Sequence, residues 1–186
     1  MPQAWVLVTG ATGFIGQHLI CALLAQDFYV LGLTRQKHKK SDHANLFWVS
    51  DLSEITQTKI DYVINLAGEN IGASRWTDAR KQQLIASRVG TTQVLLNWLR
   101  EQNIQPKRII SGSAVGFYGI DPSEQWQKSC TEQDSPQAIF VSELCQQWEA
   151  MALSDSNFDV RIIRLGVVLA ENGGILPQML NPIRWN

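Results

Sequence analysis

The segment Val8–Leu19, VTGATGFIGQHL, places three glycines three residues apart, directly after a run of apolar residues. Glycine permits a tight turn and lets a ligand come close to the backbone. The free N–H groups and the dipole at the start of a following helix attract phosphate. Because Gly10, Gly13 and Gly16 follow a predicted strand and open a predicted helix, this segment predicts a dinucleotide-binding turn.

Each glycine has its own expected task in that turn. Gly10 makes the tight turn, Gly13 lets the backbone approach a pyrophosphate, and Gly16 lets the helix pack closely on the sheet. The spacing is one residue longer at its first step than the common G-x-G-x-x-G pattern. The cofactor-binding residues predicted here are Gly10, Thr12, Gly13, Phe14, Ile15 and Gly16.

Apolar strands and helices alternate along the rest of the chain. The strands lack a polar alternation, which indicates that both of their faces are covered. We therefore expect an α/β fold, with a Rossmann-like, doubly wound parallel sheet and helices on both faces. The predicted strands are 4–10, 28–35, 46–52, 61–68, 107–113 and 158–169, and the predicted helices are 14–26, 77–101 and 138–153.

Charge, hydropathy and cysteine spacing argue against nucleic acid, membranes and metal ions as binding partners. The 186 residues carry a formal net charge of −1, without the basic surface that nucleic acid or an anionic membrane attracts. No apolar stretch is long enough to span a bilayer, and the start of the chain lacks a secretory pattern. Cys21, Cys130 and Cys145 do not have the spacing of metal ligands. We expect a reduced, cytoplasmic protein that binds no metal, nucleic acid or membrane.

The end of the second predicted strand indicates which dinucleotide binds. NAD-preferring sites place a carboxylate on the ribose 2′-hydroxyl, about twenty residues after the glycines. The segment 32–40, GLTRQKHKK, contains no acidic residue, and Thr34 and Arg35 stand where the acid would be. Arginine binds a 2′-phosphate through charge-assisted hydrogen bonds, and nearby lysines strengthen the positive field. The sequence thus predicts NADP(H) rather than NAD(H), although a solvated loop is the alternative for this basic run.

Three longer motifs carry a family resemblance. INLAGENI (64–71), RWTDARKQQLIASRVGTT (75–92) and SGSAVGFYG (111–119) resemble a subgroup usually called epimerase family proteins. That subgroup belongs to the atypical members of the extended short-chain dehydrogenase/reductase family, which includes the NAD-dependent sugar epimerases. The resemblance runs from Val6 to about Leu180. It implies an oxidoreductase or epimerase-like enzyme that acts on a small molecule, and the substrate is undefined.

The resemblance also implies a domain organisation. Members of the family continue into a smaller C-terminal substrate domain. We expect residues 1–170 to form the NADP(H)-binding domain and residues 171–186 to begin the second domain. An exposed apolar surface is expected where that domain would pack, and either aggregation or a homodimer is expected through it. We also expect cofactor binding by this chain but little turnover.

The ends of the third and fourth predicted strands resemble further cofactor contacts. In the family an Asp–hydrophobic pair meets the adenine ring, and Asp51 and Leu52 match it. The alternative for Asp51 is to cap the short helix that follows. Leu66, Ala67 and Gly68 resemble the loop that passes beneath the cofactor ribose.

The catalytic set of the family is Ser, Tyr and Lys, with Tyr and Lys four residues apart on one helix. Ser113 matches the serine. No tyrosine here is followed by lysine at that spacing. When the family pattern is aligned on Glu149, the Tyr and Lys positions fall on Val141 and Cys145. Tyr118 is the best substitute for the missing tyrosine, although no cation is evident near it. The alternative is a nucleotide-binding regulatory or sensor protein that has lost catalysis.

Three more residues are candidate substrate contacts. Arg75 and Trp76 lie in the loop after the fourth predicted strand, and Arg88 lies on the inner side of the following helix. An anionic or aromatic substrate is one interpretation of the first two, and a surface loop in which Trp76 packs on the next predicted helix, 77–101, is the other. Arg88 needs a partner if it is buried. A cofactor phosphate, a substrate anion and a structural acid are all compatible with it.

Overall fold

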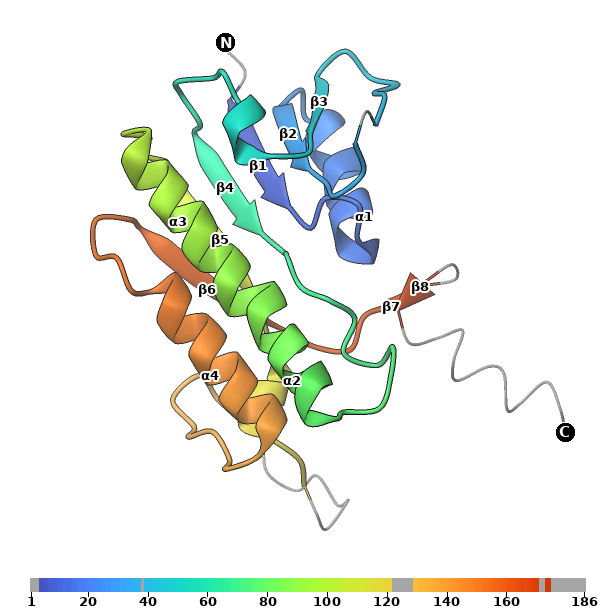
Figure 1. Cartoon of the computed structure of the whole chain (residues 1–186), viewed down its shortest axis with the longest axis vertical. Coiled ribbons are helices and arrows are strands. Elements are labelled where there is room, and N and C mark those ends of the chain that lie inside the picture. Colours follow the sequence, from blue (N-terminus) through green and yellow to red (C-terminus); the bar gives the residue numbers. More distant parts are fainter. Residues whose placement is uncertain (1–3, 38, 122–128, 171–172, 175–186) are drawn as a thin grey trace, which may run out of the picture.

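The computed structural model describes residues 4–37, 39–121, 129–170 and 173–174 (Figure 1). Six parallel strands form one sheet in the order β3-β2-β1-β4-β5-β6. From β1 the chain proceeds to one edge of the sheet, and from β4 to the other. This is the doubly wound, Rossmann-like topology that the sequence predicts. The strands are β1 (Trp5–Thr9), β2 (Tyr29–Leu33), β3 (Leu46–Val49), β4 (Tyr62–Asn65), β5 (Arg108–Ala114) and β6 (Val160–Leu165).

Helices cover both faces of the sheet. Helix α1 (Phe14–Leu24) packs on one face, and α3 (Thr91–Glu101) and α4 (Phe140–Ala152) lie side by side on the other (Figure 1). The helix predicted over 77–101 is divided into α2 (Asp78–Ile85), a π-helical turn (Ala86–Gly90) and α3. None of the described helices is long and apolar enough to cross a membrane.

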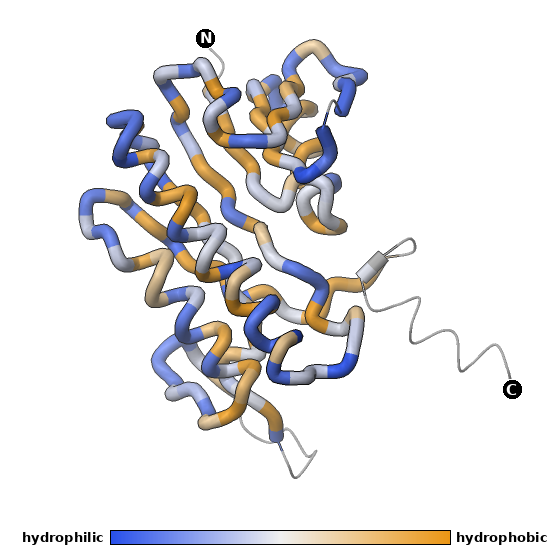
Figure 2. The backbone as a smooth tube through the Cα atoms, in the orientation of Figure 1, coloured by the Kyte–Doolittle hydropathy of each residue, from blue (hydrophilic) through white to orange (hydrophobic). Residues whose placement is uncertain are grey.

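Two apolar layers hold the helices to the sheet. Along β1, Leu7 contributes to the layer beneath α3, whereas Val6 and Val8 contribute to the layer beneath α1. Each such fully buried aliphatic side chain stabilises the fold by about 1.5–3 kcal/mol. Figure 2 shows hydrophobic residues recurring along the strands between the helices.

The α1 face of β4, β5 and β6 is covered less completely than the rest of the sheet. An apolar hollow of about 190 Å³ lies there, and Ile163 of β6 is 44% exposed. The residues that line this hollow include Ile15, Leu19, Ile64, Leu66, Ile110, Ile163 and Leu165. An apolar surface is therefore exposed on this face of the sheet, and its contact with a second domain and self-association through it stay predictions.

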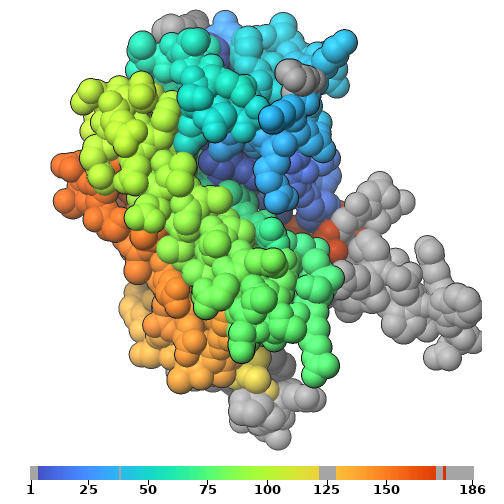
Figure 3. Space-filling model, viewed as in Figure 1, coloured from blue at the N-terminus to red at the C-terminus, as the bar shows by residue number. Residues whose placement is uncertain are grey.

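Because all six strands are parallel, their carboxyl ends meet at one edge of the sheet. The loops after β1, β2, β3, β4 and β5 gather at that edge, and the direction of winding reverses between β1 and β4. Ligands of open α/β sheets bind beyond the strand ends at this reversal. Figure 3 shows a recess there, between the blue N-terminal segments and the green segment around α2.

Candidate functional site

The turn after β1 and the first turn of α1 each require a glycine. Gly10 has a positive φ of 65°, and a Cβ there would overlap the carbonyl group of Leu66 at the end of β4. A Cβ on Gly16 would overlap the carbonyl oxygen of Gly10. The N–H of Gly13 donates to the carbonyl of Gly10 at 2.9 Å, which closes the turn. The turn and the close helix packing predicted from the sequence are therefore both present.

Helix α1 begins with free N–H groups that face this turn. Gly13 is its N-cap residue, and within the described chain neither a side-chain cap nor an acidic first-turn residue accompanies it. The first N–H groups of a helix have no partner within the helix, so they are available to an anion. The side chain of Gln17 donates to the carbonyl of Thr12 at 2.7 Å and steadies the turn. This arrangement can bind a phosphate group.

The end of β2 presents cations to the same edge. Thr34 is buried, and its hydroxyl accepts a hydrogen bond from the N–H of Gln36 at 3.1 Å. The side chain of Arg35 is 93% exposed, and its guanidinium lies 3.8 Å from the carboxylate of Glu69. The ammonium of Lys39 lies 4.7 Å from the ring centre of Trp48.

A polar hollow of about 460 Å³ adjoins these residues. Its lining includes Gln36, Lys37, Lys39, Trp48, Ser50 and Glu54. The hollow combines two ammonium groups with a flat indole, and these groups suit an anion attached to an aromatic ring. Lysines that sequence analysis treated only as a source of positive field thus line a pocket next to Arg35.

At the end of β3, Asp51 caps a short helical turn, Leu52–Glu54. Its carboxylate accepts hydrogen bonds from the hydroxyl of Ser53 at 2.7 Å and from the N–H of Ser53 at 2.9 Å. These bonds hold the pKa of Asp51 below its usual range. Leu52 is buried in the core beneath α3. The capping alternative is therefore realised in the structure, and contact with an adenine ring stays a prediction.

The loop after β4 is attached to the end of β1. The N–H groups of Leu66 and Ala67 donate to the carbonyl and hydroxyl oxygens of Thr9, at 3.3 and 3.2 Å. Gly68 lies against Arg88, since a Cβ on this glycine would be 3.1 Å from the guanidinium carbon. Leu66 and Ala67 therefore lie beside the glycine turn, followed by Gly68, and contact of this loop with a ribose stays a prediction.

A buried polar network that sequence analysis missed joins the strand ends. The hydroxyl of Thr9 donates to the side-chain carbonyl of Asn65 at 2.6 Å. The amide nitrogen of Asn65 donates to the hydroxyls of Thr92 and Ser111, at 2.9 and 3.3 Å. All four residues are buried. The available signal was a polar residue at the last position of an otherwise apolar strand.

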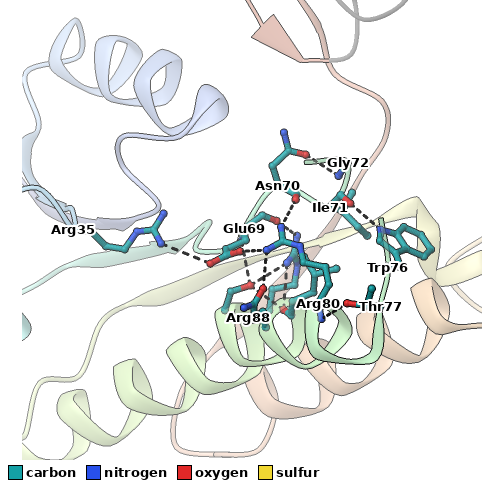
Figure 4. Close-up of polar contacts among 12 residues, drawn as sticks. Arg35, Glu69, Asn70, Ile71, Gly72, Trp76, Thr77, Arg80 and Arg88 are labelled. Atoms are coloured by element: carbon teal, nitrogen blue, oxygen red, sulfur yellow. Dashed lines mark hydrogen bonds and ion pairs between the residues drawn. The ribbon is translucent and has the colours of Figure 1, made fainter. Parts of the chain in front are cut away.

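Glu69 connects both sides of the recess (Figure 4). Its carboxylate pairs with Arg80 of α2 and lies within 3.8 Å of Arg35. Arg80 also donates to the carbonyl of Asn70 at 2.8 Å. Arginines from two elements thus converge on the loop after β4.

Arg88 holds the same loop through its backbone (Figure 4). Its guanidinium donates to the carbonyls of Glu69 and Leu84, at 2.8 and 3.3 Å. Burial lowers the pKa of this guanidinium. The partners of Arg88 in the structure are therefore backbone carbonyls and the Ser87 hydroxyl, in place of the structural acid considered from the sequence.

Trp76 packs on a helix, as the surface-loop interpretation expects, but that helix is α4 and not the next one along the chain, α2. Its indole N–H donates to the carbonyl of Ile71 at 2.9 Å, and its ring lies 5.5 Å from the ring of Phe140 at the start of α4. Arg75 is exposed beside it. A substrate contact by either residue stays a prediction.

The two candidate catalytic residues, Ser113 and Tyr118, both form hydrogen bonds with the ion pair between Glu149 and Arg164. The hydroxyl of Ser113 donates to the carboxylate of Glu149 at 2.6 Å. Arg164 of β6 binds both oxygens of that carboxylate at 2.8 Å and donates to the hydroxyl of Tyr118 at 2.9 Å. The expectation that Tyr118 has no cation near it is therefore wrong. Ser113 and Arg164 are paired in register across β5 and β6, which a linear sequence does not reveal.

Cys145 does not replace the missing lysine. It is buried, and this burial raises the pKa of its thiol, so the thiol is less readily ionised. Val141 is aliphatic and carries no proton for transfer. Among the described residues, no three His, Cys, Asp or Glu side chains form a group that would hold a metal ion.

Sequence comparisons place these residues in context. Residues 6–184 match the model of the NAD dependent epimerase/dehydratase family. The epimerase family protein SSP1921 of Staphylococcus saprophyticus is 36% identical over 183 residues, which are 95% of this chain and 59% of the relative. The epimerase family protein YfhF of Bacillus subtilis is 33% identical over 97% of this chain and 60% of its own length. The chain thus spans about three fifths of these relatives.

Solved structures agree on the fold. The crystal structure of human epimerase family protein SDR39U1 (isoform 2) with NADPH has a TM-score of 0.80 and 30% identity, over 97% of this chain and 60% of that one. A nucleoside-diphosphate sugar epimerase from Corynebacterium glutamicum has a TM-score of 0.75 and 30% identity, over 99% of this chain and 38% of that one. A UDP-glucuronic acid 4-epimerase from Bacillus cereus with NAD is 20% identical, and its TM-score of 0.73 shows the shared fold alone.

Proposed function

Because this chain belongs to the NAD dependent epimerase/dehydratase family, we propose that it binds NADP(H) in preference to NAD(H). The observation that carries the proposal is the end of β2, where Arg35 replaces the expected carboxylate and Lys37 and Lys39 line the adjacent hollow. A 2′-phosphate gains charge-assisted hydrogen bonds there, whereas the 2′-hydroxyl of NAD(H) finds no acid on this strand.

The remaining predicted contacts fit the same cofactor. The glycine turn would hold the pyrophosphate, because Gly10 and Gly16 leave backbone space that a side chain would fill. Asp51 and Leu52 would meet the adenine, and the loop from Leu66 to Gly68 would pass beneath the ribose. The NADPH in the human relative supports this proposal, while other solved relatives contain NAD. When bound at this site, NADPH would supply the hydride for reduction of a substrate.

Titration of the chain with NADPH and with NADH tests the proposal. One charge-assisted hydrogen bond contributes about 1.5–3 kcal/mol, so we expect NADPH to bind about tenfold to a hundredfold more tightly. Isothermal calorimetry at fixed, low ionic strength measures both affinities. Equal or tighter binding of NADH would refute the preference.

For the complete protein we propose a reductase or epimerase-like activity on a small molecule. We keep the two-domain organisation in this proposal, with residues 1–170 as the nucleotide-binding domain. Residues 171–186, where a second domain would begin, lie outside the described residues except for 173–174. For the full-length protein, the rate of NADPH consumption with a panel of carbonyl compounds tests the reductase activity, and the interconversion of epimers of sugar nucleotides, which consumes no NADPH, tests the epimerase-like activity.

A second function is favoured by a specific observation. Val141 and Cys145 stand where the family has its tyrosine and lysine, and neither side chain can take over proton transfer. A regulatory or sensor protein that binds nucleotide without turnover would have this pattern. If the full-length protein binds NADPH but neither consumes it nor epimerises a sugar nucleotide, and Ser113→Ala and Tyr118→Phe change nothing measurable, this second function is the correct one.

A further inference from the structure

Tyr118 carries a fixed cation at its phenol oxygen. The guanidinium of Arg164 donates to this oxygen at 2.9 Å, and its carbon lies 3.4 Å from the ring centre of the neighbouring Phe117. The two hydrogen-bonded residues are 46 positions apart in the sequence. Because the phenol oxygen accepts the hydrogen bond from Arg164, its own proton remains available to another acceptor.

Glu149 fixes the position of Arg164. Its carboxylate binds the guanidinium through two hydrogen bonds of 2.8 Å, a bidentate geometry that restricts the rotation of both groups. The side chains of Arg164 and Glu149 are only 17% and 10% exposed. The bonds to Glu149 and Tyr118 raise the pKa of Arg164, so its charge persists at every ordinary pH. The same carboxylate accepts the Ser113 hydroxyl at 2.6 Å.

We propose that Arg164 is a positioning residue that holds Tyr118 for proton transfer, in the place that a lysine on α4 would otherwise take. The inference rests on the proposed function, which supplies NADPH as the hydride source. Tyr118 then breaks its O–H bond and gives the proton to the substrate oxygen. The guanidinium balances the charge of the phenolate that remains, and water returns the proton.

The reactivity of the Tyr118 hydroxyl can be measured without a substrate, from the rate at which an arylsulfonyl fluoride labels it. Phenolate oxygen attacks the sulfur, an O–S bond forms, and fluoride leaves. Mass spectrometry of peptides from the native, NADPH-free chain gives a labelling rate for each tyrosine. Tyr29 and Tyr62 are internal controls, because both are half-buried as Tyr118 is, whereas among the described tyrosines Tyr118 alone accepts a hydrogen bond from a guanidinium.

We expect Tyr118 to be labelled at least about tenfold faster than Tyr29 and Tyr62, because the hydrogen bond from Arg164 stabilises the negative charge on the attacking oxygen in the transition state. Arg164→Gln should reduce the Tyr118 rate to that of the controls, and Arg164→Lys should retain most of it. Arg161→Gln is the matched control, since Arg161 lies on the same strand and pairs with Asp159 at the surface. It should change no rate.

Two results would overturn the inference. One is a Tyr118 rate no higher than that of the other tyrosines, and the other is a Tyr118 rate that Arg164→Gln leaves unchanged. If Arg164→Gln does not fold, as thermal unfolding would show, the decision rests on Arg164→Lys, for which a rate at the control level overturns the inference. NADPH binding is measured separately. Its loss would refute the proposed function while the labelling result for Tyr118 still stands on its own.

Discussion

Arg35 and Arg88 have the same side chain, and their surroundings give them different roles. Arg35 is almost fully exposed at the end of β2, and its guanidinium lies 3.8 Å from the carboxylate of Glu69. Arg88 is half-buried and donates to the backbone carbonyls of Glu69, in the loop after β4, and of Leu84, in α2. An exposed guanidinium is available to a ligand, whereas a buried one with carbonyl partners maintains local structure.

Arg35→Gln removes the proposed contact with the 2′-phosphate. We expect the affinity for NADPH to fall about tenfold to a hundredfold, since one charge-assisted interaction is lost. The affinity for NADH should stay within about twofold, because that cofactor has no charge at this position. Calorimetric titration measures both, with Arg161→Gln as the control. An equal loss for the two cofactors would contradict a role in their discrimination.

Arg88→Met tests the structural role of the second arginine. The carbonyl of Glu69 loses its buried donor, so we expect the free energy of unfolding to fall by about 1–3 kcal/mol. Urea denaturation followed by circular dichroism measures this loss. A variant with native stability and much weaker NADPH binding would instead assign Arg88 to the cofactor.

At the scale of elements, the contact of α1 with the loop before it depends on the absence of a side chain at Gly16. The helix begins so close to β1 that backbone atoms occupy the space a Cβ would need. At Gly90, between the π-helical turn and α3, no heavy atom lies within 4 Å of such a Cβ. Glycine is therefore required at position 16 in α1, whereas the space around position 90 would admit a larger residue.

Gly16→Ala and Gly90→Ala are therefore a matched pair of variants. We expect Gly16→Ala to destabilise the chain by about 1–3 kcal/mol, through overpacking, and to weaken NADPH binding by moving α1. Gly90→Ala should be neutral, or stabilising by up to about 1 kcal/mol, because alanine is the better helix former. Urea denaturation of both variants tests the pair. Equal effects of the two would contradict the explanation.

At the scale of the whole molecule, Asp61 ties three strands together at the amino edge of the sheet. Its buried carboxylate accepts the N–H of Trp5 in β1 at 3.0 Å and lies 3.1 Å from the ammonium of Lys107, next to β5. Burial raises the pKa of this carboxyl, but the bonds from Trp5 and Lys107 outweigh it and hold the net pKa below its usual range.

This lowered pKa determines how Asp61 contributes to stability as pH changes. A carboxyl with a lower pKa in the folded state stabilises the fold above its unfolded value, about pH 4, and the contribution is lost as pH falls through the folded value. We expect Asp61→Asn to lower the free energy of unfolding by about 1–3 kcal/mol at neutral pH. Below about pH 4, the free energy of unfolding of the variant should fall less steeply with pH than that of the unaltered protein. Urea denaturation at several pH values measures both. Parallel curves for the two proteins would contradict this role.

The sequence by itself determined the doubly wound sheet and the glycine turn. Both depend on local patterns, which are apolar strands that alternate with helices and glycines at fixed spacing before a helix. It also located Arg35 at the end of β2, because the position of a residue relative to its own strand is a local property. The boundaries were less accurate, as the π-helical turn within the helix predicted over 77–101 shows.

Only the tertiary structure decided which distant groups meet. The partners of Tyr118 and Asn65 come from neighbouring parallel strands, whose register brings them together, and a partner of Arg88 comes from the loop after β4. The family pattern places the cation four residues after the tyrosine on one helix, whereas the cation beside Tyr118 is Arg164 of β6. The strand ends gather at one edge of the sheet only after folding, so the chemistry of that edge is a property of the whole arrangement.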